Sequence, residues 1–154
     1  MSIIITGIGT DSLRKTINCT KEKLESKYSE VSVKLLDKLP QGSRLEAEDL
    51  LVTFNLSGFE QQTLTGGISY NLLNCKQIHI LLDKGLSYEE KLALPLSISM
   101  FFFCRGQDYY EYLQHTYPEI PFLQKMDKWD NEGNTLADII ENVVKLCHLV
   151  MSNN

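Results

Sequence analysis

Three short apolar runs constrain the fold of this chain more than any other feature. They are Leu50–Leu56, Ile78–Leu82 and Leu96–Cys104; each ends in a polar or glycine-containing turn, and helix-like sequence separates them. Continuous apolar runs are typical of strands buried on both faces of a parallel sheet, whereas half-exposed strands alternate. Ligands of such sheets bind beyond the carboxyl ends of the strands. The pattern therefore indicates where a site would lie, although not what it binds.

The remaining segments complete an alternation of strands and helices. Further strands are predicted for Ile3–Ile5, Val31–Leu36 and, at an edge, Pro121–Leu123. Helices are predicted from near Ser12 and over Ile68–Leu73, Tyr88–Leu94, Asp108–Tyr117 and Thr135–Met151. This order predicts a three-layer α/β fold with a mostly parallel sheet of five or six strands, flavodoxin-like or Rossmann-like. With 154 residues and no interdomain linker, we expect one α/β domain over residues 1–154.

Composition excludes several classes of partner. The net charge is −5 and no basic stripe is present, which argues against nucleic acid as the main partner. No apolar run approaches the roughly 20 residues that span a bilayer, and Met1–Gly7 lacks the basic leader of a secretory signal. The cysteines lack zinc-site spacing and lie in or beside apolar segments; they are Cys19, Cys75, Cys104 and Cys147. We expect a cytoplasmic protein with reduced thiols, no membrane association and no metal site.

The first strand-to-helix turn is a candidate for ligand binding. Its residues Thr6, Gly7, Gly9 and Thr10 would let a phosphate approach the helix N–H groups. The turn lacks the lysine of a P-loop and the third glycine of a dinucleotide loop, and Asp11 would repel a phosphate. A turn that simply starts a helix is the favoured alternative. Residues 11–13 also match part of the Gly-Asp-Ser-Leu block of SGNH esterases, but no general base can be placed, so this interpretation is rejected.

Polar residues at or just beyond the strand ends form a second candidate set. Asn55, Ser57, Asp83 and Arg105 would share one edge of a parallel sheet. Asn55 and Ser57 can donate and accept hydrogen bonds, and Arg105 could pair with a phosphate or carboxylate. Each alone is better explained as a turn, a cap or a surface ion pair. Together they are the best candidate ligand site in the sequence.

Histidine and tyrosine side chains favour structural roles. His79 alternates with Ile78 and Ile80 in a strand, which predicts a hydrogen-bonded histidine of the core or the sheet edge. Four tyrosines occur in or next to one helix and could stack on a base, cover a partner or, more commonly, pack against the sheet; they are Tyr109, Tyr110, Tyr112 and Tyr117.

The segment from Asp49 to Leu123 resembles part of the N-terminal half of spore-maturation-type glycosyltransferases of GT-B architecture. The resemblance rests on the segments Val52–Asn55, His79–Asp83, Met100–Phe103 and Asp108–Leu113, in that order. It implies an acceptor-side half, since such enzymes bind the nucleotide-sugar donor mainly in a second Rossmann half. The family's fourth strand tends to carry a tryptophan and end in Asp-x-Pro, and this chain has neither.

Three hypotheses about function follow. The first is a non-catalytic binding or regulatory module for a polar small molecule of nucleotide or nucleotide-sugar type, because no complete catalytic set is present. The second is an enzyme, either half of a split glycosyltransferase or a small flavin-binding protein. The third is a protein-interaction subunit, in contact with a partner protein or a second copy of itself. The sequence favours the first and leaves the cofactor unknown.

Overall fold

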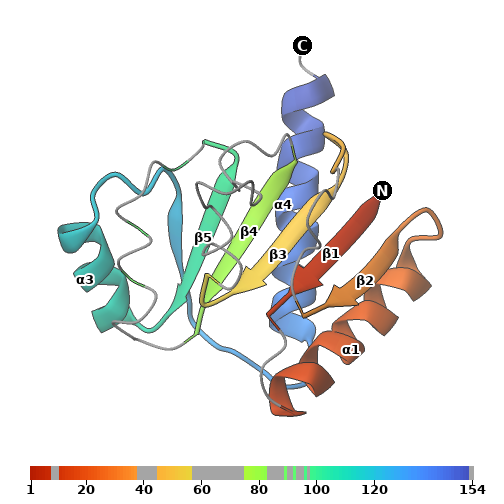
Figure 1. The fold of residues 1–154 in the computed structure, drawn as a ribbon, viewed down its shortest axis with the longest axis horizontal. Coiled ribbons are helices and arrows are strands. Elements are labelled where there is room, and N and C mark those ends of the chain that lie inside the picture. Colours follow the sequence, from red (N-terminus) through yellow and green to blue (C-terminus); the bar gives the residue numbers. More distant parts are fainter. Residues whose placement is uncertain are drawn as a thin grey trace, which may run out of the picture.

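The computed structural model describes residues 1–7, 11–37, 45–56, 75–82, 89, 92, 96 and 98–152, the last seven by their backbone alone (Figure 1). Its strands are β1 (Ser2–Thr6), β2 (Ser32–Leu36), β3 (Leu50–Phe54), β4 (Lys76–Leu81), β5 (Met100–Arg105) and β6 (Leu123–Met126). Its helices are α1 (Asp11–Lys27), α3 (Gln107–Thr116) and α4 (Asn134–Ser152). These strands form one parallel sheet in the order β2-β1-β3-β4-β5-β6. The predicted flavodoxin-like or Rossmann-like α/β fold is confirmed.

One face of the sheet packs against α1 and α4. Both helices carry an apolar stripe at helical spacing, which includes Ile17 and Leu24 on α1 and Leu136 and Ile140 on α4. These side chains contact alternate residues of the strands, as the two-residue period of a strand requires. Figure 1 shows α4 running behind the central strands. We call this side of the sheet the α1/α4 face.

The opposite face packs against α3, and we call it the α3 face. Tyr109 and Leu113 of α3 join the buried residues Phe102 and Cys104 of β5 in a second apolar cluster. Helices therefore cover both faces of the sheet, and the fold has the three layers that the sequence predicted. The strands that were expected from continuous apolar runs are buried on both faces, since every residue of β3 is buried.

Several element boundaries differ from the sequence prediction. The third strand was expected to reach Leu56 but ends at Phe54, because the next two residues adopt positive φ angles. The fifth was expected to begin at Leu96 but begins at Met100, and Ile98 is 90% exposed. The edge strand begins at Leu123 instead of Pro121, because proline has no N–H to donate to the ladder. The helices predicted over 68–73 and 88–94 lie largely outside the described residues.

The loop between β6 and α4 is fixed to the first helix. Thr16 donates its hydroxyl hydrogen to the carbonyl of Asn131 at 3.1 Å, and Thr20 donates to that of Gly133 at 3.3 Å. Gly133 has φ +85°, and a Cβ there would lie 2.6 Å from Thr20 Oγ1. Only glycine fits this conformation and this close approach. Helices α1 and α4 are thereby held side by side.

Candidate ligand site at the switch point of the sheet

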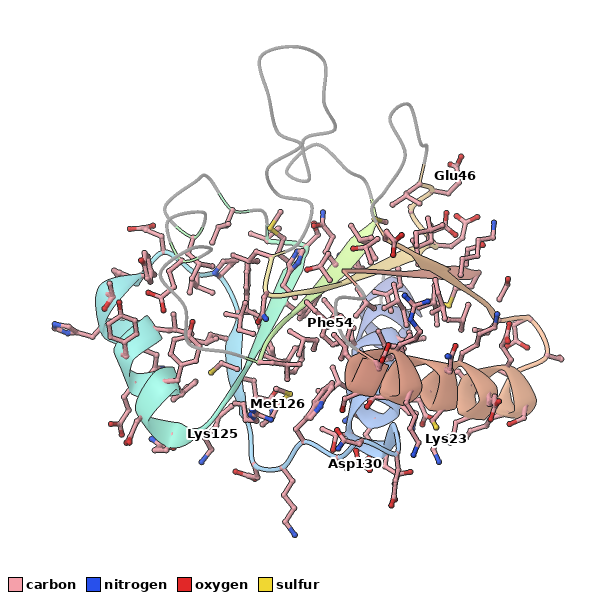
Figure 2. The ribbon with its side chains drawn as sticks, turned by 60° about the horizontal axis from the view of Figure 1, so that its bottom comes forward. Lys23, Glu46, Phe54, Lys125, Met126 and Asp130 are labelled. Carbon is pink, nitrogen blue, oxygen red and sulfur yellow. The ribbon has the colours of Figure 1, made fainter. Side chains whose placement is uncertain are left out.

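The strand order places a topological switch point between β1 and β3. The chain first moves from β1 outward to β2, then returns to the other side of β1 and continues through β3 to β6. In open α/β sheets, the crevice beyond the strand ends at such a reversal is the usual ligand site. We use "switch point" for the carboxyl ends of β1 and β3, with residues Thr6, Gly7 and Asn55. Figure 2 shows Phe54, Met126 and Asp130 along this edge of the molecule.

Thr6 ends β1 with an unsatisfied hydroxyl. The residue is 0% exposed, and among the residues that the structure describes, its Oγ1 is the one buried side-chain polar atom without a hydrogen-bond partner. Because Ile3 and Ile5 pack on the α1/α4 face, strand alternation directs Thr6 to the α3 face. A buried hydroxyl without a partner costs about 1–3 kcal/mol, so proteins rarely keep one. Within the described part of the chain, no group supplies the hydrogen bond that this atom lacks.

The end of β3 has a strained backbone beside Thr6. Asn55 and Leu56 have φ angles of +51° and +55°, a conformation that costs a non-glycine residue roughly 1–2 kcal/mol. Two hydrogen bonds hold Asn55 there: its backbone N–H donates to Ile80 at 2.8 Å, and its Oδ1 accepts from the N–H of Leu82 at 2.9 Å. Asn55 thus ties the end of β3 to β4, and Leu56 is fully buried. Strain of this kind tends to be kept at functional sites.

Gly7 leads the chain out of β1 with φ +86°. Its N–H donates to the backbone carbonyl of Asp37 at 3.3 Å, just beyond the paired residues Thr6 and Leu36. Asp37 is exposed and lies directly beside the glycine turn. Asp37 was not among the site residues predicted from the sequence. The signal that could have identified it is its position directly after β2, the first strand that follows the glycine turn and α1.

A buried polar row continues from Thr6 across the α3 face. The β3–β4 register aligns Thr53 with His79, and Thr53 Oγ1 lies 2.6 Å from His79 Nδ1. His79 Nε2 lies 3.0 Å from Gln77 Oε1. Since an amide oxygen only accepts, Nε2 carries the proton and Nδ1 accepts from the Thr53 hydroxyl. Full burial lowers the pKa of His79 to about 3, so the ring is neutral. The prediction of a hydrogen-bonded core histidine is confirmed.

Part of the predicted set comes together at the switch point. Thr6, Gly7 and Asn55 lie on neighbouring strands, whereas Arg105 ends β5, three strand positions from β1 and therefore about 14 Å away at the usual spacing. Arg105 is exposed there. The other predicted ligand-binding residues lie outside the described residues; they are Gly9, Thr10, Ser57 and Asp83.

Two tyrosines of α3 hold a buried carboxylate. Tyr109 and Tyr112 donate their hydroxyl hydrogens to Glu89 at 3.1 and 3.0 Å, and Glu89 is 2% exposed. The side chains face inward, so packing against the sheet is the correct interpretation for this pair. The buried thiols Cys75 and Cys104 lie on the same face, and burial raises the pKa of each to about 11. Thiols in that state are poor nucleophiles.

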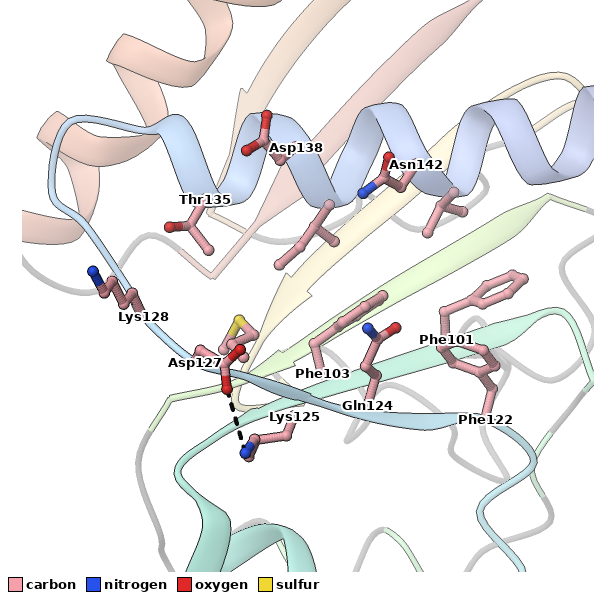
Figure 3. A pocket seen from close by; sticks show the side chains of 13 residues that line it. Phe101, Phe103, Phe122, Gln124, Lys125, Asp127, Lys128, Thr135, Asp138 and Asn142 are labelled. Atoms are coloured by element: carbon pink, nitrogen blue, oxygen red, sulfur yellow. Dashed lines mark ion pairs between the residues drawn. The ribbon is translucent and has the colours of Figure 1, made fainter.

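A groove with a volume of about 540 Å³ lies on the other face, between β5, β6 and α4 (Figure 3). Its floor contains Phe101, Phe103 and Phe122, whose rings meet at centroid distances of 5.0 and 6.0 Å. Lys125 stands at the rim in an ion pair with Asp127 at 3.3 Å. The groove is separate from the switch point, and it was not predicted from the sequence.

The comparisons with known proteins give no relative for this chain. No family model matches it, and neither a curated protein nor a solved structure shows significant similarity. Within the described ranges, no group of three or more His, Cys, Asp or Glu side chains could hold a metal ion. In the same part of the chain, no helix combines the length and apolarity that a membrane crossing requires.

Proposed function

We propose that this chain is a binding or regulatory module that recognises a polar small molecule of nucleotide or nucleotide-sugar type at the carboxyl edge of its sheet. The observation that carries the proposal is the buried, unpartnered hydroxyl of Thr6 at the switch point. A ligand that supplies the missing hydrogen bond would repay the desolvation cost of that hydroxyl.

The geometry around Thr6 supports a ligand there. Gly7 at φ +86° has no Cβ to obstruct a molecule beside the turn. Asn55 is held by one backbone hydrogen bond to Ile80 and by one from the N–H of Leu82 to its side-chain Oδ1, so the end of β3 is preorganised at the cost of backbone strain. Preorganised walls lower the entropy cost of binding.

Binding is favoured over catalysis by the state of the buried reactive groups. His79 has both ring nitrogens engaged, and a base with a pKa of about 3 is weak at neutral pH. The thiols of Cys75 and Cys104 remain protonated because burial raises their pKa. These groups fit a structural role.

Native mass spectrometry of the purified protein with adenosine, AMP, UDP-glucose and FMN tests the proposal. We expect a one-to-one adduct with at least one of these probes, lost in Thr6→Val and kept in Arg105→Ala. The valine variant keeps the shape of threonine and removes only the hydroxyl, while Arg105→Ala alters a strand end away from the switch point. Absence of any adduct, or equal binding by wild type and Thr6→Val, would contradict the proposal.

A further inference from the structure

The groove between β5, β6 and α4 is the part of the α1/α4 face that the described helices leave open (Figure 3). Helices pack roughly 8–10 Å apart and strands about 4.8 Å apart, so two helices cover about four of the six strands. Helix α1 lies against β2 and beside α4, which leaves the far end of the sheet uncovered. The volume of the groove, about 540 Å³, lies in the usual range for small-molecule sites.

The floor of the groove is aromatic because of the strand register. The β5–β6 pairing aligns Phe103 with Gln124. Two residues earlier on each strand are Phe101 and Phe122, whose rings meet edge to face at a centroid distance of 5.0 Å. Ile139 of α4 lines the opposite wall. A flat ring of a ligand can pack on this floor, since aromatic rings favour offset-stacked and edge-to-face contacts.

Two carboxamides line the groove from its two sides. Gln124 projects from β6 and Asn142 from the facing helix α4 (Figure 3). Both residues are exposed, and within the described part of the chain neither side chain has a hydrogen-bond partner. Each carboxamide has a carbonyl oxygen that accepts and an NH₂ group that donates. Together they complement a flat ligand whose edge carries an acceptor next to a donor.

The charged residues of the groove balance one another and lie at its periphery. Lys125 is paired with Asp127 at 3.3 Å. The other two charged lining residues, Lys128 and Asp138, have opposite signs; Figure 3 shows Lys128 on the loop at one end and the carboxylate of Asp138 directed away from the strands. A charged ligand group over the phenylalanine rings would lose its hydration without gaining an opposite charge. The lining therefore favours an uncharged ligand.

We infer that the groove is a second ligand site, which takes an uncharged aromatic or heteroaromatic ring with a carboxamide-like edge, a C=O next to an N–H. The ring packs on the phenylalanine floor. The C=O of the ligand accepts a hydrogen bond from one protein carboxamide, and its N–H donates to the other. This site goes beyond the proposed function, because the groove lies on the α1/α4 face and Thr6 faces the α3 face.

An NMR titration of ¹⁵N-labelled protein with benzamide, acetophenone, benzoate and benzamidinium tests the inference, because these probes share a ring and a shape and differ in donor and charge. We expect benzamide to bind with a dissociation constant on the order of 1 mM, as suits so small a ligand, and to shift the side-chain NH₂ signals of Gln124 and Asn142. Acetophenone, which has no N–H, should bind roughly three- to tenfold more weakly, the effect of one neutral hydrogen bond. Both charged probes should also bind more weakly.

Leucine substitutions separate the carboxamides from the apolar floor. Gln124→Leu and Asn142→Leu keep a side chain of similar size and remove its hydrogen bonds, so each should weaken benzamide binding roughly three- to tenfold. In the double variant, benzamide and acetophenone should bind equally. Asn18→Leu makes the same change at an exposed position of α1 and is the matched control, which should keep the wild-type affinity. Circular dichroism checks that each variant is folded.

Three results would overturn the inference. The first is equal binding of benzamide and acetophenone by the wild type, or tighter binding of a charged probe. The second is an unchanged affinity for benzamide in both Gln124→Leu and Asn142→Leu. The third is the absence of shifts in the groove residues at benzamide concentrations well above the expected dissociation constant. None of them would affect the switch-point proposal, which has its own probes and its own variant on the other face of the sheet.

Discussion

The two faces of the sheet differ in how they treat polar side chains. On the α1/α4 face, the buried residues of the four central strands are apolar throughout, as in β4, where Ile78 and Ile80 point to that face. The buried polar side chains of the strands all lie on the α3 face; they are Thr6, Thr53, Gln77 and His79. Alternate residues of one strand thus lie in different environments, one apolar and the other containing buried polar side chains.

The difference indicates that the apolar face provides most of the stability of the fold and that the polar row provides specificity. Burial of an apolar face stabilises the fold in proportion to the area that is removed from water. Such a face tolerates substitutions between apolar side chains of similar volume. A buried polar row contributes only if each member is satisfied, so its residues are constrained by one another. Thr53, His79 and Gln77 have hydrogen-bond partners within the row, whereas the hydroxyl of Thr6 has none among the described residues. This difference is why we propose that a ligand contacts Thr6.

The largest effect is expected on the apolar face. Ile78→Ala should lower the free energy of unfolding by about 2–5 kcal/mol, because Ile78 is fully buried between two strands and its truncation leaves a cavity. Urea denaturation measures this change. Ile78→Val, which removes a single methylene, is the matched control and should cost about 0.5–1.5 kcal/mol. Equal stability of Ile78→Ala and wild type would mean that this face is not the main core.

The polar row should make stability depend on pH. The pKa of His79 is lowered from the ordinary 6.5 to about 3 in the folded protein, so the unfolded chain binds a proton first as the solution is acidified. The contribution of the neutral ring is therefore complete above pH 6.5 and is lost as pH falls toward 3, by about 1.4 kcal/mol per pH unit. Urea titrations between pH 7 and pH 4 measure the slope.

His79→Gln is the control for this slope, since glutamine does not titrate. The free energy of unfolding of the variant should fall less steeply over the same pH range. Asp130 should lower the stability of both proteins at still lower pH, because its pKa in the folded protein lies below its usual 3.8. The largest cause of that shift is the hydrogen bond from the backbone N–H of Thr135. Parallel slopes for wild type and His79→Gln would remove His79 as the source.

Two threonine-to-valine substitutions on the same face should have opposite signs. Thr53→Val removes the hydroxyl that donates to His79 Nδ1, and it should cost about 1–3 kcal/mol because a buried acceptor loses its partner. Thr6→Val removes a buried hydroxyl without a partner and should stabilise the free protein by about 1 kcal/mol. Thermal unfolding of both variants gives the comparison. A loss of stability in Thr6→Val would show that its hydroxyl is satisfied within the protein.

The smallest effect is expected at the surface of the α1/α4 face. Lys27 Nζ lies 3.1 Å from Glu141 Oε2 and joins α1 to α4, but the lysine side chain is 58% exposed. Lys27→Met should change the unfolding midpoint by little more than the error, because exposed ion pairs are screened by solvent. The comparison of low and high salt measures it. A large, salt-dependent loss would assign the helix pairing to electrostatics instead of apolar contacts.

The sequence predicted the buried strands well because their apolar runs are local signals. Ile3–Ile5 and Ile78–Leu82 needed no knowledge of neighbours. The start of β5 was missed, because Leu96 and Ile98 continue the apolar pattern although Ile98 is exposed. The order of the strands in the sheet could not be predicted, because the same pattern of strands is compatible with several orders. The polar row from Thr6 to His79 can be recognised only once the register of the strands is known.

The attachment of the β6–α4 loop to α1 also affects how the chain acquires its fold during synthesis. The partners of Thr16 and Thr20 lie 115 and 113 residues further along the chain. On the ribosome, α1 can therefore form early, but its buried residues Ile17 and Leu24 stay without α4 until residues 131–143 have emerged. During that interval its apolar stripe is available to chaperones, and completion of the core depends on a segment that is made long after α1.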